Sequence, residues 1–479
     1  MRNKKGQLSL QVLIFGVVSI IIISGFALWA SSFLKFSLRD FNKTLAFSIS
    51  EAGIEYYRWH LAHSPLDFQD GTGGPGPYVH NYYDKNGILL GQFSLEITSP
   101  PVGSTIVDIK STSQLTVDSS IQKIIKVKMG YSSLTKYAVL ANDNLRFGSG
   151  TLAYGPIHSN GGIRFDGVAY NTVYSAQASY DDPDHSGGNE FGVHTHVSPV
   201  DPLPPTAVPS RPDVFAAGRQ FPVPAVDFAG LTQSLAQIKS DAQTAGRYFA
   251  SSTVAGYHIV LKTDGTFDFY KVTSLYPKIP SCNNSLSEDG WGTWSIDTEV
   301  FLQNYAFPAN GLIFVEDDLW VSGQINKARL TIAVGRFPEV SETNANISIT
   351  DNILYTNYDG QDALGLIAQN NITVGLVSQD NLRLDTALVA KNGRVGRYYY
   401  RPPTSGGGGN EGCGQWNVRS SVTTYGTLAS NHNYSFSFSD STGYLIQNLN
   451  YDSNMVYNPP PSFPVSSYSY QQLLWDEVK

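Results

Sequence analysis

The sequence is poor in charged residues and in sulfur. Charged side chains make up 15% of its 479 residues, against roughly 25% in an average soluble domain. Only 2 Cys and 3 Met are present, which excludes a disulfide-dense scaffold and a cysteine-rich zinc module. The formal net charge of −8 argues against a nucleic-acid partner held by phosphate neutralisation. The Gly-x-Ser-x-Gly, P-loop and HExxH motifs are also absent from the sequence, so none of these catalytic signatures is available.

Glycine, proline and aromatic residues are abundant instead. The chain has 44 Gly and 25 Pro, and 12% of its residues are aromatic. The aromatic content excludes wholesale disorder, while frequent turn residues are typical of β proteins with many short strands. We therefore predict a mainly β protein whose polar surface is largely uncharged.

The N-terminus has the composition of a membrane-spanning helix. Three basic residues precede Gly6, and the stretch from Val12 to Leu34 contains no ionisable side chain. At about 1.5 Å per residue this stretch crosses a hydrocarbon core of about 30 Å. The positions of the basic residues predict a cytoplasmic N-terminus. The body of the chain is then expected outside the cytoplasmic membrane or on a cell-surface filament.

The apolar pattern continues beyond this span. Apolar residues recur at steps of three or four as far as Trp59, and the first proline is Pro65. The apolar region of a secretory signal peptide is only about 7–15 residues long. We therefore predict one continuous helix over residues 7–63.

The leader and the start of this helix resemble a known signal. The basic segment Lys4–Gln7 followed by Leu8–Gln11 resembles the class III leader of type IV prepilins. The resemblance implies that a prepilin peptidase removes residues 1–6 by cutting between Gly6 and Gln7, and that the mature chain assembles with other pilin-like subunits. Gln11 stands at the mature position usually held by Glu, a departure that favours a minor or tip subunit over a bulk filament subunit.

A second motif lies at the far end of the helix. The segment Ile49–Tyr57, which contains Glu51-Ala52-Gly53-Ile54-Glu55, resembles the end of the N-terminal helix of PilX-type pilus assembly proteins. Together the two motifs imply a pilin-like helix followed by a small β-sheet head, expected at residues 64–130.

The rest of the chain predicts a large β body. Short apolar runs separated by Gly, Asn and Asp corners at 131–198 and again at 301–479 favour a β-solenoid in two parts. The second part ends in a tail rich in Pro and Tyr. A Pro-rich connector and a helix-plus-hairpin unit at 199–300 separate the parts, and we expect this unit on the solenoid flank. A β-sandwich built from the same strands stays open as the alternative.

Candidate chemistry is sparse. His185, His194 and His196 follow Asp181, Asp182 and Asp184, a composition that suits Zn²⁺ or another divalent ion, although a solvated polar loop is the more ordinary explanation. Acidic corners at Asp351, Asp359 and Asp362 suit structural Ca²⁺ without an EF-hand spacing. No cofactor is otherwise implied.

Two further features concern the outer part of the chain. Cys282 and Cys413 are its only cysteines, and both lie on the predicted outer side, where a disulfide can form. The Tyr398–Tyr400 run suits either glycan stacking or the interior of the body.

These observations predict a non-enzymatic, pilin-like surface protein. Its expected partners are the lipid bilayer, a prepilin peptidase, other pilus subunits and a surface glycan or host-cell ligand. A membrane-anchored pseudopilin-like protein outside any filament is one alternative. A polysaccharide-active β-helix enzyme is the other.

Overall fold

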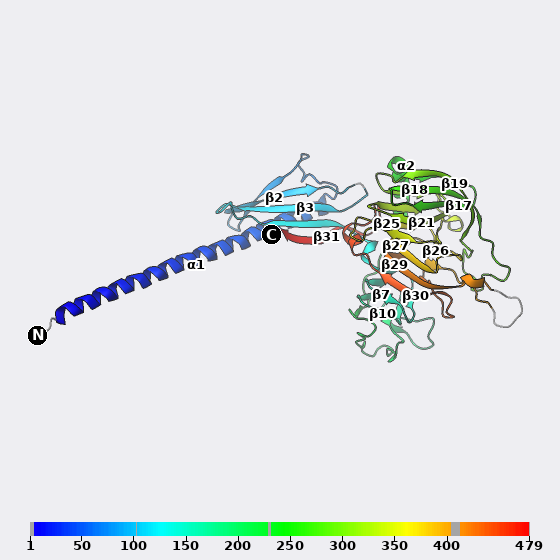
Figure 1. Ribbon diagram of the computed structural model, residues 1–479, viewed down its shortest axis with the longest axis horizontal. Helices are drawn as coiled ribbons and strands as arrows, with labels where there is room; N and C mark the ends of the chain where they lie inside the picture. The colour runs from blue at the N-terminus through cyan, green and yellow to red at the C-terminus, as the bar shows by residue number, and fades with distance from the viewer. Residues whose placement is uncertain (1–3, 102, 229–230, 404–411, 479) are drawn as a thin grey trace. The chain divides into compact units, whose positions relative to one another are not determined.

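The computed structural model describes residues 4–101, 103–228, 231–403 and 412–478 (Figure 1). The chain forms two compact units. The first, called the head here, comprises residues 1–99, 107–130 and 470–479, and the second, called the body, comprises 100–106 and 131–469. The body is therefore inserted in the sequence of the head.

The head begins with one long helix, α1 (Lys4–His63), which confirms the continuous N-terminal helix predicted from the sequence. Every residue from Gln7 to Phe41 is exposed. By length and composition α1 is able to cross a membrane, and exposed apolar side chains over this length are stable only in an apolar surrounding.

A five-stranded sheet completes the head. Its strands, in spatial order, are β1 (Tyr78–Tyr83), β2 (Leu89–Thr98), β3 (Val107–Leu115), β4 (Ile124–Ser133) and β31 (Val465–Val478). The first four are joined by antiparallel pairings. Alternate residues of β3 are buried, as expected for a sheet with one face on a core. The segment expected to be a tail beyond the solenoid thus supplies a strand of the head.

The last turns of α1 pack on this sheet through buried apolar residues and a glycine. Ala46, Ile49 and Tyr57 are fully buried, whereas Trp59 is 59% exposed. The face of α1 that packs on the sheet is therefore not the apolar face predicted from the sequence, which included Trp59. A side chain at Gly53 would overlap Ser111 Oγ of β3 and lie 2.9 Å from the ring of Phe93 in β2. Gly53 thus permits the helix to approach the sheet closely, which gives the Glu-Ala-Gly-Ile-Glu motif a structural role.

Most strands of the body pair in parallel and form three groups, the second of which is made of two sets that no pairing among the described strands joins. The first follows the order β16 (Arg247–Phe249), β20 (Leu312–Val315), β22 (Arg329–Val334), β25 (Ala363–Ala368), β27 (Asn381–Ala390), β29 (Val418–Ser430), β5 (Val139–Ala141), β8 (Ile157–Ser159), β11 (Val173–Ser175) and β15 (Arg219–Gln220). The second contains β17 (Gly256–Leu261), β21 (Leu319–Ile325), β23 (Ile347–Ile349), β26 (Ile372–Val374) and β28 (Val395–Arg397), and a separate set β6 (Leu145–Phe147), β9 (Ile163–Phe165) and β14 (Val193–His194). The third joins β21, β24 (Ile353–Tyr355), β27, β29, β30 (Gly443–Asn450), β7 (Leu152–Ala153) and β10 (Val168–Ala169).

The order of strands in the first ladder differs from their order in the chain. β29 pairs in parallel with β5, so that Leu428 lies beside Val139. The two β segments of the sequence therefore form one continuous stack, which the chain enters in the middle. One register position is aliphatic and at most 1% exposed through eight successive strands, at Ile313, Ile332, Leu366, Leu388, Leu428, Val139, Ile157 and Val173. This shared row of buried side chains stabilises the junction.

The ends of the body segment meet near this junction. The amide of Leu134, close to where the chain enters the body, donates to the carbonyl of Pro464, close to where it leaves, at 3.2 Å. A short helix, α3 (Asn454–Tyr457), precedes the exit. Because entry and exit are adjacent, the body can be inserted between β4 and β31 without separating two neighbouring strands of the head sheet.

The unit between the two β segments extends the ladders. β16 and β17 pair in parallel with β20 and β21, and the antiparallel strands β18 (Thr266–Leu275) and β19 (Ile296–Ala306) follow. Helix α2 (Leu231–Ala245) buries Leu235, Ile238 and Ala242. The unit expected on the solenoid flank thus supplies backbone partners for the terminal ladder strands.

Candidate functional site

A cluster of histidines and carboxylates lies at one end of the body. The short strands β12 (Ser179–Tyr180) and β13 (Glu190–Phe191) pair antiparallel and enclose the 181–189 loop. β14 follows directly and pairs in parallel with β9, placing His194 beside Arg164. This arrangement brings together Asp182 of the loop, Glu190 of β13, and His194 and His196.

The four side chains converge on one point. One ligand atom from each lies within 4.8 Å of all the others. His196 Nε2 is 3.2 Å from Glu190 Oε2, and His194 Nε2 is 3.4 Å from Asp182 Oδ2. His194 Nε2 also contacts Glu190 Oε2. Asp182, Glu190 and His194 are each at most 4% exposed.

Burial disfavours the charged form of His194. Burial lowers the pKa of His194 below its ordinary value, although the carboxylate of Glu190 acts in the opposite direction. A neutral imidazole is the form that coordinates metals. Nitrogen and carboxylate ligands together suit Zn²⁺ and related divalent ions, so these residues have the chemistry to hold one.

The structure brings together some of the predicted metal ligands and not others. His194 and His196 meet at the cluster, and His185 is held at its edge, with Nδ1 2.6 Å from Glu190 Oε1. Asp184 instead pairs with Arg146. Glu190, which contacts all three histidines, was not predicted. Its position four residues before His194, across a Gly, was the available signal.

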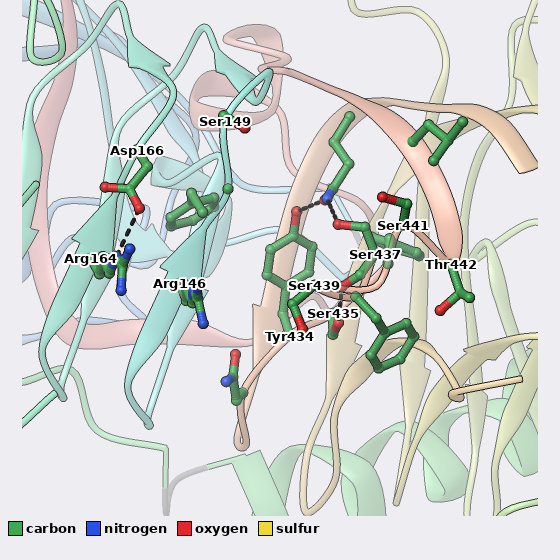
Figure 2. Close-up of a pocket in the computed structure, with 17 residues that line it drawn as sticks. Arg146, Ser149, Arg164, Asp166, Tyr434, Ser435, Ser437, Ser439, Ser441 and Thr442 are labelled. Atoms are coloured by element: carbon green, nitrogen blue, oxygen red, sulfur yellow. Dashed lines mark hydrogen bonds and ion pairs between the residues drawn. The ribbon is translucent and has the colours of Figure 1, made fainter. Parts of the chain in front are cut away.

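A cavity of about 710 Å³ lies beside β6 and β9 (Figure 2). Arg146 and Arg164, which are register partners on these strands, line one side. The other side is lined by hydroxyl, amide and apolar side chains, among them Ser435, Ser437, Thr442, Gln447, Phe438 and Leu445. Gln447 Nε2 donates to Ser437 Oγ at 2.6 Å, so part of this polar wall is held in a fixed orientation.

The charges at the cavity are already paired. Arg164 Nε lies 2.7 Å from Asp166 Oδ2, and Arg146 pairs with Asp184. Among the described residues that line the cavity, Asp166 is the one carboxylate. A glycosidase of the usual kind requires two carboxyl groups across the scissile bond. The cavity therefore has the groups to bind a polar, uncharged molecule.

The carboxylates at the acidic corners expected to suit Ca²⁺ accept hydrogen bonds from neighbouring residues. Asp362 is buried, and its carboxylate accepts hydrogen bonds from the amides of Ala328, Thr356 and Asn357 at 2.7–3.0 Å. These bonds occupy the oxygen lone pairs that a cation would need. Asp359 bonds locally to Gln361. The carboxylates at these corners thus shape turns of the ladders.

Cys282 and Cys413 form a disulfide with an S–S distance of 2.06 Å. Around it lie the buried side chains of Leu376, Tyr398 and Tyr400. Two residues of the Tyr398–Tyr400 run therefore belong to the interior of the body, and their hydroxyl groups donate to the backbone carbonyls of Asp289 and Gly292.

The predicted processing site lies at the edge of the described chain. Residues 1–3 lie outside the described residues, as do the side chains of residues 4–6, including Gly6. Gln7, Gln11, Val12 and Leu34 are exposed positions of α1. The structure does not test cleavage between Gly6 and Gln7.

No protein-family model and no curated protein matches the chain. Among solved structures, the chain is similar to the competence-associated pilin ComZ from Thermus thermophilus, at 12% sequence identity. The similarity covers 91% of this chain and 97% of that chain, with a TM-score of 0.33. A TM-score of this size does not establish a shared overall fold.

Proposed function

We propose that this chain is a minor or tip subunit of a type IV pilus-like filament. The observation that carries the proposal is the division of α1 into two parts. Residues 7–41 are wholly exposed, while Ala46, Ile49 and Tyr57 are buried on the head sheet. An apolar helix that projects from its own domain needs a bilayer or the helices of neighbouring subunits to cover it. Both surroundings occur when a membrane-held subunit enters a filament.

Gln11 supports the role of a minor subunit in such a filament. A buried carboxylate at this position needs a cationic partner to be stable, whereas an amide offers only hydrogen bonds. Gln11 therefore cannot supply the charge pairing expected of a repeated bulk subunit. A subunit present in few copies, or anchored in the membrane without entering a filament, does not need that pairing.

The processing step is tested at Gly6. When the full chain is co-expressed with a prepilin peptidase, we expect N-terminal sequencing to show a mature chain that starts at Gln7. Gly6→Leu is expected to abolish processing, because the peptidase must accommodate this residue at the cut. Gly16→Leu introduces the same side chain at an open position of α1 and is expected to leave cleavage unchanged.

An intact Met1 in the wild-type chain would contradict the prepilin assignment. Recovery of the chain only with membranes, and not with sheared filaments, would favour the anchored alternative.

We further infer that the body is a β-solenoid that displays a saccharide-binding cavity. Parallel pairing in three ladders supports a solenoid over an antiparallel sandwich. The cavity supports saccharide binding because its hydroxyl and amide groups can bond to sugar hydroxyls, while Phe438 and Leu445 can cover an apolar sugar face. Its paired charges argue against recognition dominated by net charge.

Leu445→Trp tests the cavity directly. Leu445 is 53% exposed and lines the cavity, so an indole at this position is expected to occupy part of the binding volume. We expect saccharide binding, measured on a glycan array and then by calorimetry, to weaken more than about tenfold, or about 1.4 kcal/mol. Ile446 is 51% exposed and does not line the cavity, so Ile446→Trp is the matched control. Equal binding by both variants would contradict the assignment, and turnover of a bound polysaccharide would favour the enzyme alternative.

A further inference from the structure

We propose that Asp182, Glu190, His194 and His196 form a structural binding site for one Zn²⁺ ion per chain. The proposal goes beyond pilus assembly and saccharide display, because it concerns neither α1 nor the cavity ligand. It rests on the geometry of the cluster, on buried polar atoms without a hydrogen bond and on the local charge.

The geometry of the cluster fits a tetrahedral ion. With metal–ligand distances of about 2.0–2.2 Å, neighbouring ligand atoms of a tetrahedral zinc site lie about 3.3–3.5 Å apart. The distance from His196 Nε2 to Glu190 Oε2 is 3.2 Å, and that from His194 Nε2 to Asp182 Oδ2 is 3.4 Å. These two separations match the edges of such a tetrahedron, whereas His194 Nε2 and Glu190 Oε2 lie closer together and would move apart when an ion enters between them.

Two buried polar atoms in the cluster make no hydrogen bond. Both His194 Nε2 and Asp182 Oδ2 are inaccessible to solvent and make no well-oriented hydrogen bond, although His194 Nε2 lies against Glu190 Oε2, and their residues are 1% and 4% exposed. A buried polar atom left in this state destabilises the folded protein. Because both atoms point into the same space, a single cation would satisfy them together.

The local charge favours a divalent cation. The guanidinium of Arg164 lies at the edge of the cluster, with Nε 2.7 Å from Asp166 Oδ2 and Nη1 3.6 Å from Asp182 Oδ2. It therefore faces two carboxylates, those of Asp166 and Asp182. The carboxylates of Asp182 and Glu190 lie close together and are both buried. Buried carboxylates are stabilised by a counter-ion of opposite sign.

The remaining contacts hold the ligands in position. The backbone amide of His196 donates to Asp166 Oδ1 at 2.8 Å, and that of Thr195 donates to Asp201 Oδ2 at 3.1 Å. These bonds fix the chain just before and at the second histidine, as outer contacts do in zinc sites. Two imidazoles with two carboxylates favour Zn²⁺ over Ca²⁺, which prefers oxygen ligands throughout. The ion would connect the 181–189 loop to β13 and β14.

The test uses the full chain in detergent, stripped with EDTA and then dialysed against zinc or cobalt chloride. We expect one Zn²⁺ per chain by elemental analysis, and visible absorption typical of tetrahedral Co²⁺. His194→Ala and Glu190→Gln are each expected to weaken binding more than about tenfold. His432→Ala, an exposed histidine elsewhere in the body, is the matched control and should bind as the wild type does.

Three results of this experiment would contradict the proposal. Failure of the wild type to retain Zn²⁺ would overturn the proposal, and so would equal retention by Glu190→Gln, since the ion would then be held at the surface. Binding of Ca²⁺ in preference to Zn²⁺ would overturn the assigned metal. Glu190→Gln preserves the size of the side chain, so it remains informative if His194→Ala does not fold. Processing at Gly6 and saccharide binding are measured separately, and their failure would leave this result unaffected.

Discussion

Replacing Arg397 with alanine is expected to destabilise the body by about 3–5 kcal/mol, as is usual when one partner of a buried charged network is removed. Arg397 is 0% exposed. Its guanidinium donates to the carbonyls of Gly375, Leu376 and Trp416 at 2.5–2.9 Å and to Ser378 Oγ at 2.8 Å. Truncation leaves these buried acceptors without a donor, and each unsatisfied group is unfavourable by about 1–3 kcal/mol.

The rings around Arg397 add to this effect. The guanidinium carbon lies 4.8 Å from the ring centre of Tyr400 and 5.6 Å from that of Tyr444, within the range of cation–π attraction. Burial lowers the pKa of Arg397 from its ordinary value, but the side chain of an arginine stays protonated in proteins. The cation is therefore balanced by carbonyl dipoles and aromatic faces.

Urea unfolding followed by tryptophan fluorescence measures this prediction. Arg58→Ala is the control, because the side chain of Arg58 is 56% exposed and pairs only with Glu55, three residues away on α1. We expect that control to change stability by less than about 0.5 kcal/mol. If Arg397→Ala has an equally small effect, the hydrogen-bond network around Arg397 does not stabilise the body as argued.

Removing the disulfide is expected to lower the free energy of unfolding by about 2–5 kcal/mol. Cys282 and Cys413 are separated by 131 residues. The value should lie toward the upper end of that range, because a cross-link over a long loop restricts the unfolded chain most. Both cysteines are at most 1% exposed, so serine at both positions also places hydroxyl groups in an apolar cluster.

The chain supplies its own control for this experiment. Since Cys282 and Cys413 are its only cysteines, a reductant has no other thiol target. Dithiothreitol should therefore shift the urea midpoint of the wild type toward that of the Cys282→Ser/Cys413→Ser variant and leave the variant unchanged. An identical midpoint for oxidised wild type and double variant would show that the bond contributes no stability.

Local sequence pattern was sufficient for the helix and for the class of the body. No proline precedes Pro65, and apolar residues recur with helical spacing, so α1 could be predicted from neighbours in the chain. Short β runs between turn residues likewise predicted a mainly β body. The face of α1 that packs on the sheet could not be predicted in this way. Counting apolar residues selected Trp59, whereas close approach to the sheet selected Gly53, and a glycine acquires that role only from what lies against it.

The candidate metal site was likewise predicted only in part from the sequence. His194 and His196 were predicted because two histidines at this spacing are visible in the sequence. Glu190 was not, because its carboxylate reaches them only where the chain bends at Gly192, between β13 and β14. The sequence did not decide whether the disulfide forms, for a similar reason. Its cysteines are separated by 131 residues, and no local pattern specifies that they meet.

The sequence by itself determined the elements with short-range causes: an apolar helix that needs a non-aqueous surrounding, a β body rich in turns, and the residue types available for chemistry. Only the tertiary structure decided which strands are neighbours. It placed β5 after β29, returned the C-terminal segment to the head as β31, and brought Glu190 to the histidines. The physical reason is that backbone hydrogen bonds between strands are alike in every pair. The choice of partner therefore depends on the match of buried side chains across the whole stack, which no single segment contains.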